Sequence, residues 1–109
     1  MKTPREVTGV PQTEKQFATA VEDLLRYMGW TFYHVYEQQV YARRSTKDFP
    51  DFLCVREKQM VVLELKSEKG KVTLGQAWWL AALVKACPQA VVRVMRPSQW
   101  LELVELLKW

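Results

Sequence analysis

Two apolar segments of the chain, residues 51–57 and 60–66, are separated only by the polar dipeptide Lys58-Gln59. Two strand-like runs joined by a short polar link are typical of a β-hairpin. The apolar density of both segments predicts strands that are covered on both faces. The second segment nevertheless ends with two charged residues, Glu64 and Lys66.

The sequence on either side of this hairpin predicts three helices and two further strands. Capping-box patterns at residues 13–16 and 73–76 mark the starts of two helices, and Ser98 is expected to cap a third. The expected elements are a helix at 14–28, a strand at 30–37, the hairpin, a helix ending at Ala86, a strand at 90–95 and a helix ending at Lys108. This order, αβββαβα, predicts an α/β domain over residues 13–109 behind a loose arm at 1–12.

Composition narrows the class of protein. The chain has 109 residues, of which 49% are apolar, and its net charge of +4 favours polyanionic partners such as nucleic acid. Cys54 and Cys87 each stand alone, which excludes a zinc site or a disulfide framework. No segment has the pattern of a secretion signal or a membrane span, so we expect a cytoplasmic protein with no membrane partner.

The charged end of the hairpin predicts a cation site. Residues i and i+2 of a strand project from the same face, so Glu64 and Lys66 are expected to point together. A turn at Lys58-Gln59 pairs Leu53 with Glu64 and Asp51 with Lys66, and so brings Asp51 to that face. The Cβ atoms of Asp51 and Glu64 are then about 6 to 8 Å apart, a span that one oxygen-ligated cation can bridge.

Two interpretations of this cluster remain open at this point. The three side chains could form a structural group of ion pairs at a strand end. Alternatively, two carboxylates with one ammonium leave a partly buried negative charge uncompensated, and a bound divalent cation removes that cost.

The residues around the hairpin resemble a known signature. Pro50-Asp51, twelve intervening residues and then Glu64-Leu65-Lys66 resemble the PD-(D/E)XK nuclease motif. A wider set is similar to the virus-type replication-repair nuclease domain, VRR-NUC, over residues 13 to about 108. The members of that set are residues 13–17, Gly29-Trp30, Tyr33-His34, Phe49-Pro50-Asp51, Glu64-Leu65-Lys66, Thr73 with Gln76, and residues 91–97. Asp48 stands where such domains usually have glycine.

This resemblance implies a fold and an activity. It implies a restriction-endonuclease-like αβββαβ core with a mixed four-stranded sheet, flanking helices and a C-terminal helix. It implies a DNA endonuclease that holds Mg²⁺ or Mn²⁺ through Asp51, Glu64 and the backbone carbonyl of Leu65, with Lys66 orienting the attacking water. It further implies branched DNA, such as a four-way junction or flap, as the substrate in replication or repair.

Two further residues have competing explanations. Glu14 lies in the first turn of the first helix, where the helix dipole favours a carboxylate, whereas the resemblance implies an additional catalytic acid and metal ligand. Gln76 occupies the third position of a capping box, whereas the resemblance implies an amide contact near the active site. We expect both to belong to the site.

Basic, aromatic and histidine residues complete the set of candidates. Arg43, Arg44 and Lys47 before the motif, and Lys69 and Lys71 after it, are expected to contact DNA phosphates. His34 is more typical of a structural strand histidine, although the resemblance includes it. One of Trp78 and Trp79 is expected to fill the core, and neither is assigned to DNA.

The sequence thus favours a divalent-metal-dependent DNA endonuclease. Coordinated cuts on two strands need two sites, so we expect a homodimer joined through exposed apolar helix residues. The alternatives are a non-catalytic nucleic-acid-binding or assembly module with the same fold and, less favoured, a protein interaction module.

Overall fold

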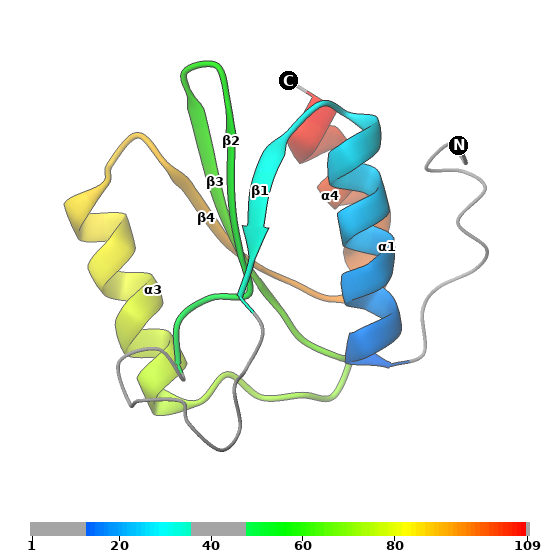
Figure 1. Ribbon diagram of the computed structural model, residues 1–109. Coiled ribbons are helices and arrows are strands. Elements are labelled where there is room, and N and C mark those ends of the chain that lie inside the picture. Colours follow the sequence, from blue (N-terminus) through cyan, green and yellow to red (C-terminus); the bar gives the residue numbers. More distant parts are fainter. Residues whose placement is uncertain (1–12, 36–47, 109) are drawn as a thin grey trace.

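The computed structural model describes residues 13–35 and 48–108 of the chain. The arm at 1–12 and the basic residues Arg43, Arg44 and Lys47 lie outside the described residues. The elements are α1 (Glu14–Tyr27), β1 (Thr31–His34), β2 (Phe52–Arg56), β3 (Gln59–Leu65), α3 (Leu74–Ala86), β4 (Val91–Met95), the 3₁₀ turn η2 (Pro97–Gln99) and α4 (Trp100–Lys108). The predicted order of helices and strands is confirmed in the described part of the chain (Figure 1).

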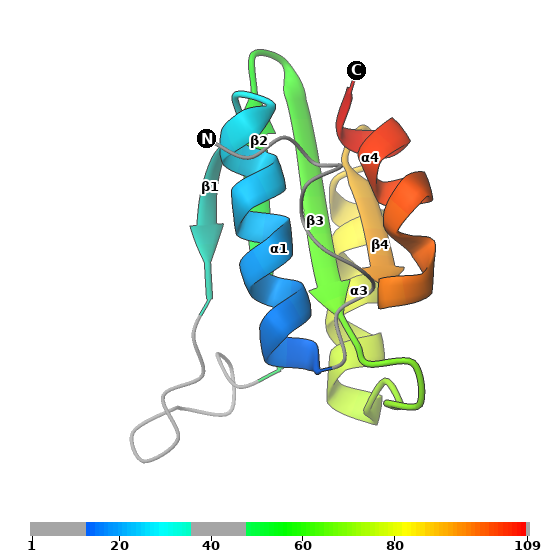
Figure 2. The same cartoon turned by 90° about the vertical axis from the view of Figure 1, so that its right-hand side faces the viewer.

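The four described strands form one mixed sheet in the order β1-β2-β3-β4. The β1–β2 and β2–β3 pairs are antiparallel, whereas β3 and β4 are parallel. A parallel pair needs a crossover connection, and α3 supplies it. Figure 2 shows α1 in front of the sheet and α3 behind it.

The main core lies between the sheet and the helices α1 and α4. Phe17 of α1, Leu63 of β3 and Leu103 of α4 are all fully buried in it. Trp30 closes one end, where its indole Nε1 donates a 2.9 Å hydrogen bond to the Leu107 carbonyl. Burial of each such side chain contributes about 1.5–3 kcal/mol, so this side of the sheet carries most of the apolar packing.

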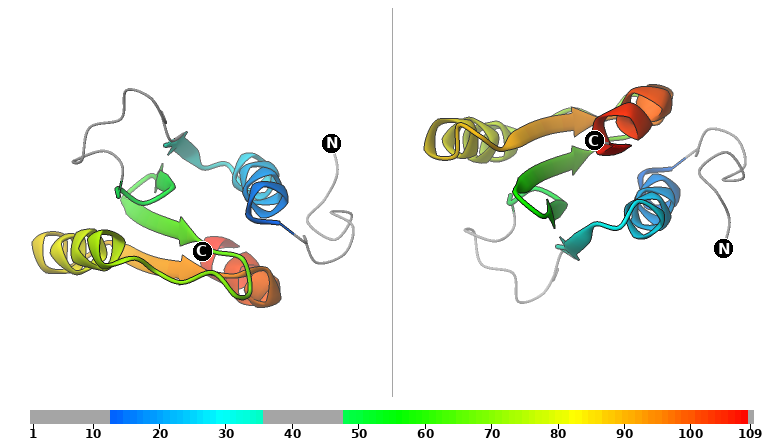
Figure 3. Two further views of the ribbon diagram at one scale, coloured as in Figure 1. Left: turned by 90° about the horizontal axis from the view of Figure 1, so that it is seen from below. Right: turned by 90° about the horizontal axis from the view of Figure 1, so that it is seen from above.

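The opposite face of the sheet is covered only in part. Helix α3, all of whose residues are described, contains no buried residue, and its contacts are chiefly with β4. The views along the strands in Figure 3 show α3 beside β4, away from β1. The prediction that both hairpin strands are covered on two faces is therefore confirmed for β3 and wrong for β2, where Val55 is exposed.

Two local predictions are corrected by the backbone. Ser98 does not cap the last helix. It lies inside the 3₁₀ turn Pro97–Gln99, and the N-cap residue of that turn is Arg96. Neither tryptophan of α3 fills the core. Trp79 is half-buried against Phe49, with ring centroids 5.0 Å apart, and Trp78 is exposed.

The hairpin register also differs from the expected one. The observed pairs include Phe52 with Leu63 and Arg56 with Gln59, so the two-residue turn is Glu57-Lys58. Glu57, the first residue of this turn, has the positive φ, here 55°, that two-residue hairpin turns require. Sequence reasoning placed it one residue later, since no glycine or asparagine marks the position.

Replacing Glu57 with glycine should stabilise the protein. A non-glycine residue at positive φ is strained, and glycine removes that strain at some entropic cost in the unfolded chain. We expect Glu57→Gly to raise the free energy of unfolding by about 0.5–1 kcal/mol in urea titrations. Lys58→Gly is the control, since Lys58 lacks the positive φ and should gain nothing. A gain in the control equal to that of Glu57→Gly would contradict this account.

Candidate metal and phosphodiester site

The corrected register still places the three motif side chains on one face of the sheet. Extending the β2–β3 pairing by one residue sets Asp51 opposite Glu64 instead of Lys66. A shift of one residue in the turn moves the register by two residues, which leaves every side chain on its expected face. Asp51, Glu64 and Lys66 therefore lie on the half-covered face, opposite to the core face that carries Leu63 and Leu65.

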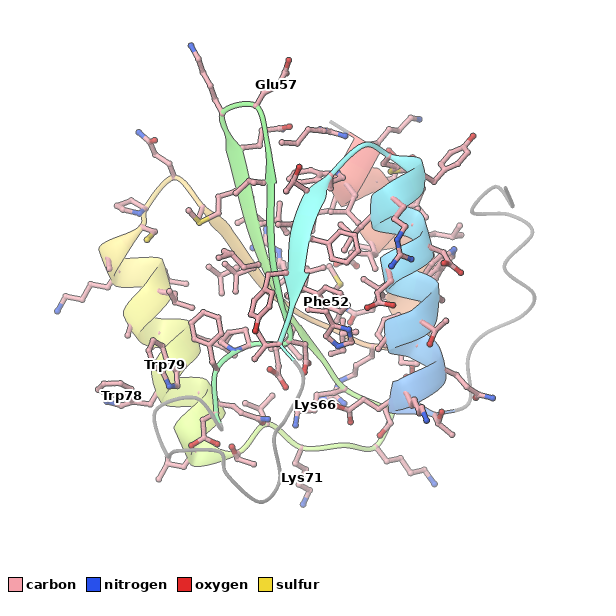
Figure 4. All side chains as sticks on the ribbon, viewed as in Figure 1. Phe52, Glu57, Lys66, Lys71, Trp78 and Trp79 are labelled. Carbon is pink, nitrogen blue, oxygen red and sulfur yellow. The ribbon has the colours of Figure 1, made fainter. Side chains whose placement is uncertain are left out.

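The site lies where β3 ends and β2 begins. Asp51 directly precedes β2, Glu64 is the penultimate residue of β3, and Lys66 directly follows that strand. Figure 4 shows Lys66 at the end of the sheet where the first turns of α1 and α3 also lie.

Glu64 and Lys66 form a buried ion pair. The exposed fractions are 2% for Glu64 and 8% for Lys66, and the Lys66 Nζ lies 3.6 Å from the Glu64 Oε2. Asp51 is half-buried, and its Oδ2 accepts a 2.7 Å hydrogen bond from the backbone N–H of Leu65. The arrangement thus contains two carboxyl groups and one ammonium group with little access to water.

Burial is the main reason why the pKa values of both carboxyl groups are raised. Loss of hydration, followed by the charge of Asp51, raises the pKa of Glu64 to about 8 against the partial compensation of Lys66. The pKa of Asp51 is also raised, chiefly by burial, although the Leu65 N–H opposes the rise. The cluster therefore has an excess of negative charge when both acids are ionised, which is the property that suits a divalent cation.

Glu14 reaches this cluster only through its charge. It is exposed in the first turn of α1, and its negative charge raises the pKa of both Asp51 and Glu64. Across residues 13–35 and 48–108, no three histidine, cysteine or acidic side chains are grouped closely enough to share a metal ion. Glu14 therefore lies near the acid pair without completing a three-acid cluster with it.

The Leu65 carbonyl lies on the edge of β3 that Asp51 occupies. The N–H of Leu65 points to Asp51, whereas the N–H of Lys66 donates to the Met95 carbonyl on the β4 side. In an extended strand the N–H and C=O of one residue point to the same side. The Leu65 carbonyl thus faces the side of the strand from which a shared cation could be bound.

Gln76 has a clear structural role. Its Oε1 accepts a 2.9 Å hydrogen bond from the Thr73 N–H, and its own N–H donates to the Thr73 hydroxyl at 3.2 Å. The capping box predicted from the sequence is confirmed, and it occupies the amide oxygen. A contact of Gln76 with the active site stays a prediction.

His34 is held on the core side of the sheet. Its Nδ1 lies 2.7 Å from the Glu22 Oε2, and its ring stacks on Phe52 with centroids 4.2 Å apart. These contacts are the structural role that is usual for a strand histidine. The positive form of His34 also lowers the pKa of Asp51, so the pair with Glu22 lies close enough to influence the site.

The described basic candidates lie in the connection between β3 and α3. Lys69 and Lys71 are both exposed, and Figure 4 shows Lys71 pointing away from the body of the molecule at the Lys66 end. They can therefore contact a polyanion without first breaking an internal interaction that buries them.

Two features near the site were missed by sequence reasoning. The Asp48 carboxyl group packs against Gly75 in the first turn of α3, where a Cβ would stand only 2.6 Å from the Asp48 Cγ. Arg96 donates to the carbonyls of the turn that follows Lys66. A lone acid and a lone arginine carry no spacing signal, so only the three-dimensional contacts show them.

Together, the fold and the site define an α/β protein with a mixed four-stranded sheet and a buried Asp–Glu–Lys group at one end. Comparison of the chain with known protein families, with curated proteins and with solved structures finds no match. No helix in the described ranges has the length and apolar character needed to span a bilayer. The cytoplasmic location stays a prediction.

The raised pKa of Glu64 predicts that stability falls as the pH increases. The unfolded chain releases this proton near pH 4.5 and the folded chain near pH 8, so unfolding between these values releases a proton. Without added metal, the free energy of unfolding should therefore decrease on the order of a few kcal/mol across this range. Denaturant titrations of Glu64→Gln should show a much flatter profile.

The exposed Glu102→Gln variant is the control for the loss of one carboxylate. It should retain the slope of the unmodified protein. If Glu64→Gln retained that slope as well, the buried carboxyl group would not be its source.

Proposed function

We propose that the protein is a divalent-metal-dependent DNA endonuclease of the PD-(D/E)XK type, similar to VRR-NUC domains. One observation carries the proposal: the hairpin brings Asp51, Glu64 and Lys66, the three residues of the motif, to one face at the end of a mixed sheet. Strongly raised pKa values of grouped carboxyl groups occur preferentially at functional sites. A bound divalent cation would compensate the negative charge that the two acids carry when both are ionised beside a single ammonium.

Asp51 and Glu64 are the residues that would hold Mg²⁺ or Mn²⁺, with the Leu65 carbonyl as a further oxygen ligand. Their oxygen donors are of the kind that these hard cations prefer. When bound, such an ion lowers the pKa of a water molecule and neutralises charge on the phosphate. Glu14 contributes negative charge at a greater distance and is a second-tier candidate.

Lys66 is the residue of the chain that would place a positive charge at the reacting phosphate. Its ammonium is fixed beside Glu64 and is largely shielded from solvent, so its field is weakly screened. In this position it can donate hydrogen bonds to the attacking water and to a phosphate oxygen. Its removal should therefore reduce the rate more than the affinity for DNA.

The substrate class rests on the resemblance and on charge. Lys69 and Lys71 are exposed in the connection that follows Lys66, and Arg43, Arg44 and Lys47 are further phosphate contacts proposed from the sequence. Branched DNA, such as a four-way junction or a flap, is the proposed substrate within replication or repair.

A homodimer is proposed through the exposed side of α3. Its outward stripe has the helical spacing i, i+3, i+4, i+7 and i+10 and consists of Leu74, Ala77, Trp78, Ala81 and Val84. The stripe carries no charge, which favours a protein surface over a phosphate backbone as its cover. In an antiparallel pair of α3 helices, Trp78 of one copy would lie over the small Ala81 of the other.

The nuclease proposal is tested by cleavage of labelled duplex, flap and four-way-junction DNA. We expect cleavage with Mg²⁺ or Mn²⁺ and none with a chelator. Asp51→Asn and Lys66→Ala should each lower the rate on the order of 100-fold or more because they remove a metal ligand and the fixed positive charge. DNA binding, measured by fluorescence anisotropy, should survive in both variants.

Asp23→Asn provides the matched control, since Asp23 is exposed on α1 and pairs with Arg26. It should cleave at the unmodified rate. Metal-independent cleavage, or equal turnover by all variants, would refute the assigned site. Salt-dependent DNA binding by a protein that never cleaves would favour the alternative, a non-catalytic nucleic-acid-binding or assembly module.

The dimer proposal predicts a mass of twice 12.8 kDa for the protein at micromolar concentration in sedimentation experiments. Trp78→Glu places a charge in the apolar stripe and should shift the protein to monomer. Leu101→Glu makes the same kind of change on α4, where Leu101 is exposed outside the stripe, and should remain dimeric. A monomeric unmodified protein would contradict the proposal.

A further inference from the structure

The turn that follows Lys66 is held by a residue from a different strand. Residues Ser67–Gly70 form a tight turn in which the Gly70 N–H donates to the Ser67 carbonyl at 3.1 Å. Arg96, directly after β4, donates from Nη1 to the carbonyls of Ser67 and Gly70, each at 2.6 Å. Its guanidinium thus joins both ends of the turn.

A second contact holds the same turn from the outside. The Glu68 carboxylate accepts a 2.6 Å hydrogen bond from the Ser98 N–H and a 2.9 Å hydrogen bond from the Ser98 hydroxyl. The turn therefore accepts hydrogen bonds from residues 96–98 in two ways. Its carbonyls accept from Arg96, and its Glu68 carboxylate accepts from Ser98. Two such sets of bonds restrict the turn more than either set alone.

The restrained turn lies directly on the Lys66 side chain. A Cβ placed on Gly70 would be in ordinary van der Waals contact with the Lys66 Cδ, at 3.6 Å, so Gly70 lies beside the aliphatic stem of Lys66 and faces it. The stem in turn carries the ammonium that lies beside Glu64. A lysine has four rotatable side-chain bonds, and packing along its stem limits the directions in which the Nζ can point.

We propose that Arg96 is a positioning residue, which fixes the Ser67–Gly70 turn over the stem of Lys66 and so aims the Lys66 ammonium at the acid pair. The proposal rests on the nuclease function proposed above for its effect on rate. Its structural part, the restraint of Lys66, holds for this chain whatever reaction the site performs. The Ser67–Gly70 turn, which includes Glu68, and Arg96 together are called the clamp below.

Arg96→Gln tests the clamp, with Arg93→Gln as the matched control. Both variants remove one positive charge from the β4 segment, but Arg93 lies in the middle of the strand, is exposed, and donates from its guanidinium to the neighbouring Val92 carbonyl. We expect Arg96→Gln to lower kcat about 10- to 100-fold, the usual effect of a small misplacement of a catalytic group. KM for DNA and the affinity for Mn²⁺ should change no more than in Arg93→Gln.

Arg96→Lys keeps the charge and supplies a simpler donor, so its kcat should lie between those of the unmodified protein and Arg96→Gln. This variant also keeps the test usable if Arg96→Gln does not fold, as judged by circular dichroism. A loss that appears only in KM, and equally in Arg93→Gln, would show Arg96 to be a phosphate contact and would overturn the proposal.

A second measurement separates the clamp from the nuclease function. Reductive methylation followed by mass spectrometry reports how accessible each lysine is, and Lys66 should react slowly in the unmodified protein and in Arg93→Gln. In the Arg96 variants its modification rate should increase several-fold, while exposed Lys58 is unchanged. If the protein cleaved no DNA, this measurement would still decide the clamp. Equal protection of Lys66 in Arg96→Gln would refute it.

Discussion

The structure is organised around the carboxyl group of Glu64 and the amino group of Lys66, which lie together in the most buried part of its sheet. Every residue from Val61 to Lys66 is buried, and β3 has a strand on each side, so Glu64 has almost no contact with water. Transfer of a carboxylate into such surroundings costs several kcal/mol, and one ammonium at 3.6 Å repays only part of it. Replacing Glu64 alone would leave the buried Lys66 ammonium without its partner, so the two residues depend on each other.

Three sets of contacts hold the residues in and around this pair. The Leu65 N–H holds the Asp51 carboxylate, and the turn fixed by Arg96 packs along the stem of Lys66. The segment before Asp51 is anchored by Asp48 against Gly75 of α3. These contacts involve one oxygen of Asp51, the stem of Lys66 and the segment before the site, and Asp51 remains the most exposed of the three motif side chains.

Sequence reasoning found the elements and the faces, but it did not find the positions that depend on single residues. The shared face of Asp51 and Glu64 was predicted correctly from a wrong register, because a shift of two residues preserves the alternation of a strand. The turn itself could not be placed, since Glu57 adopts a conformation that its residue type disfavours. Arg96 belongs to the set that carries the resemblance, but its contacts gave no signal, because its acceptors are backbone carbonyls, which every residue possesses.

The exposed apolar surface and the site occupy the same face of the sheet for a common reason. Helices α1 and α4 cover most of one face, whereas α3 lies over β4 and leaves Tyr33 and Val55 exposed on the other. The polyanionic substrate proposed for the site needs an uncovered face, since a second helix over β2 would block Asp51. That requirement leaves apolar side chains of β1, β2 and α3 without cover inside one chain. A second copy that buries the α3 stripe would resolve this conflict while the acid pair stays open at the end of the sheet.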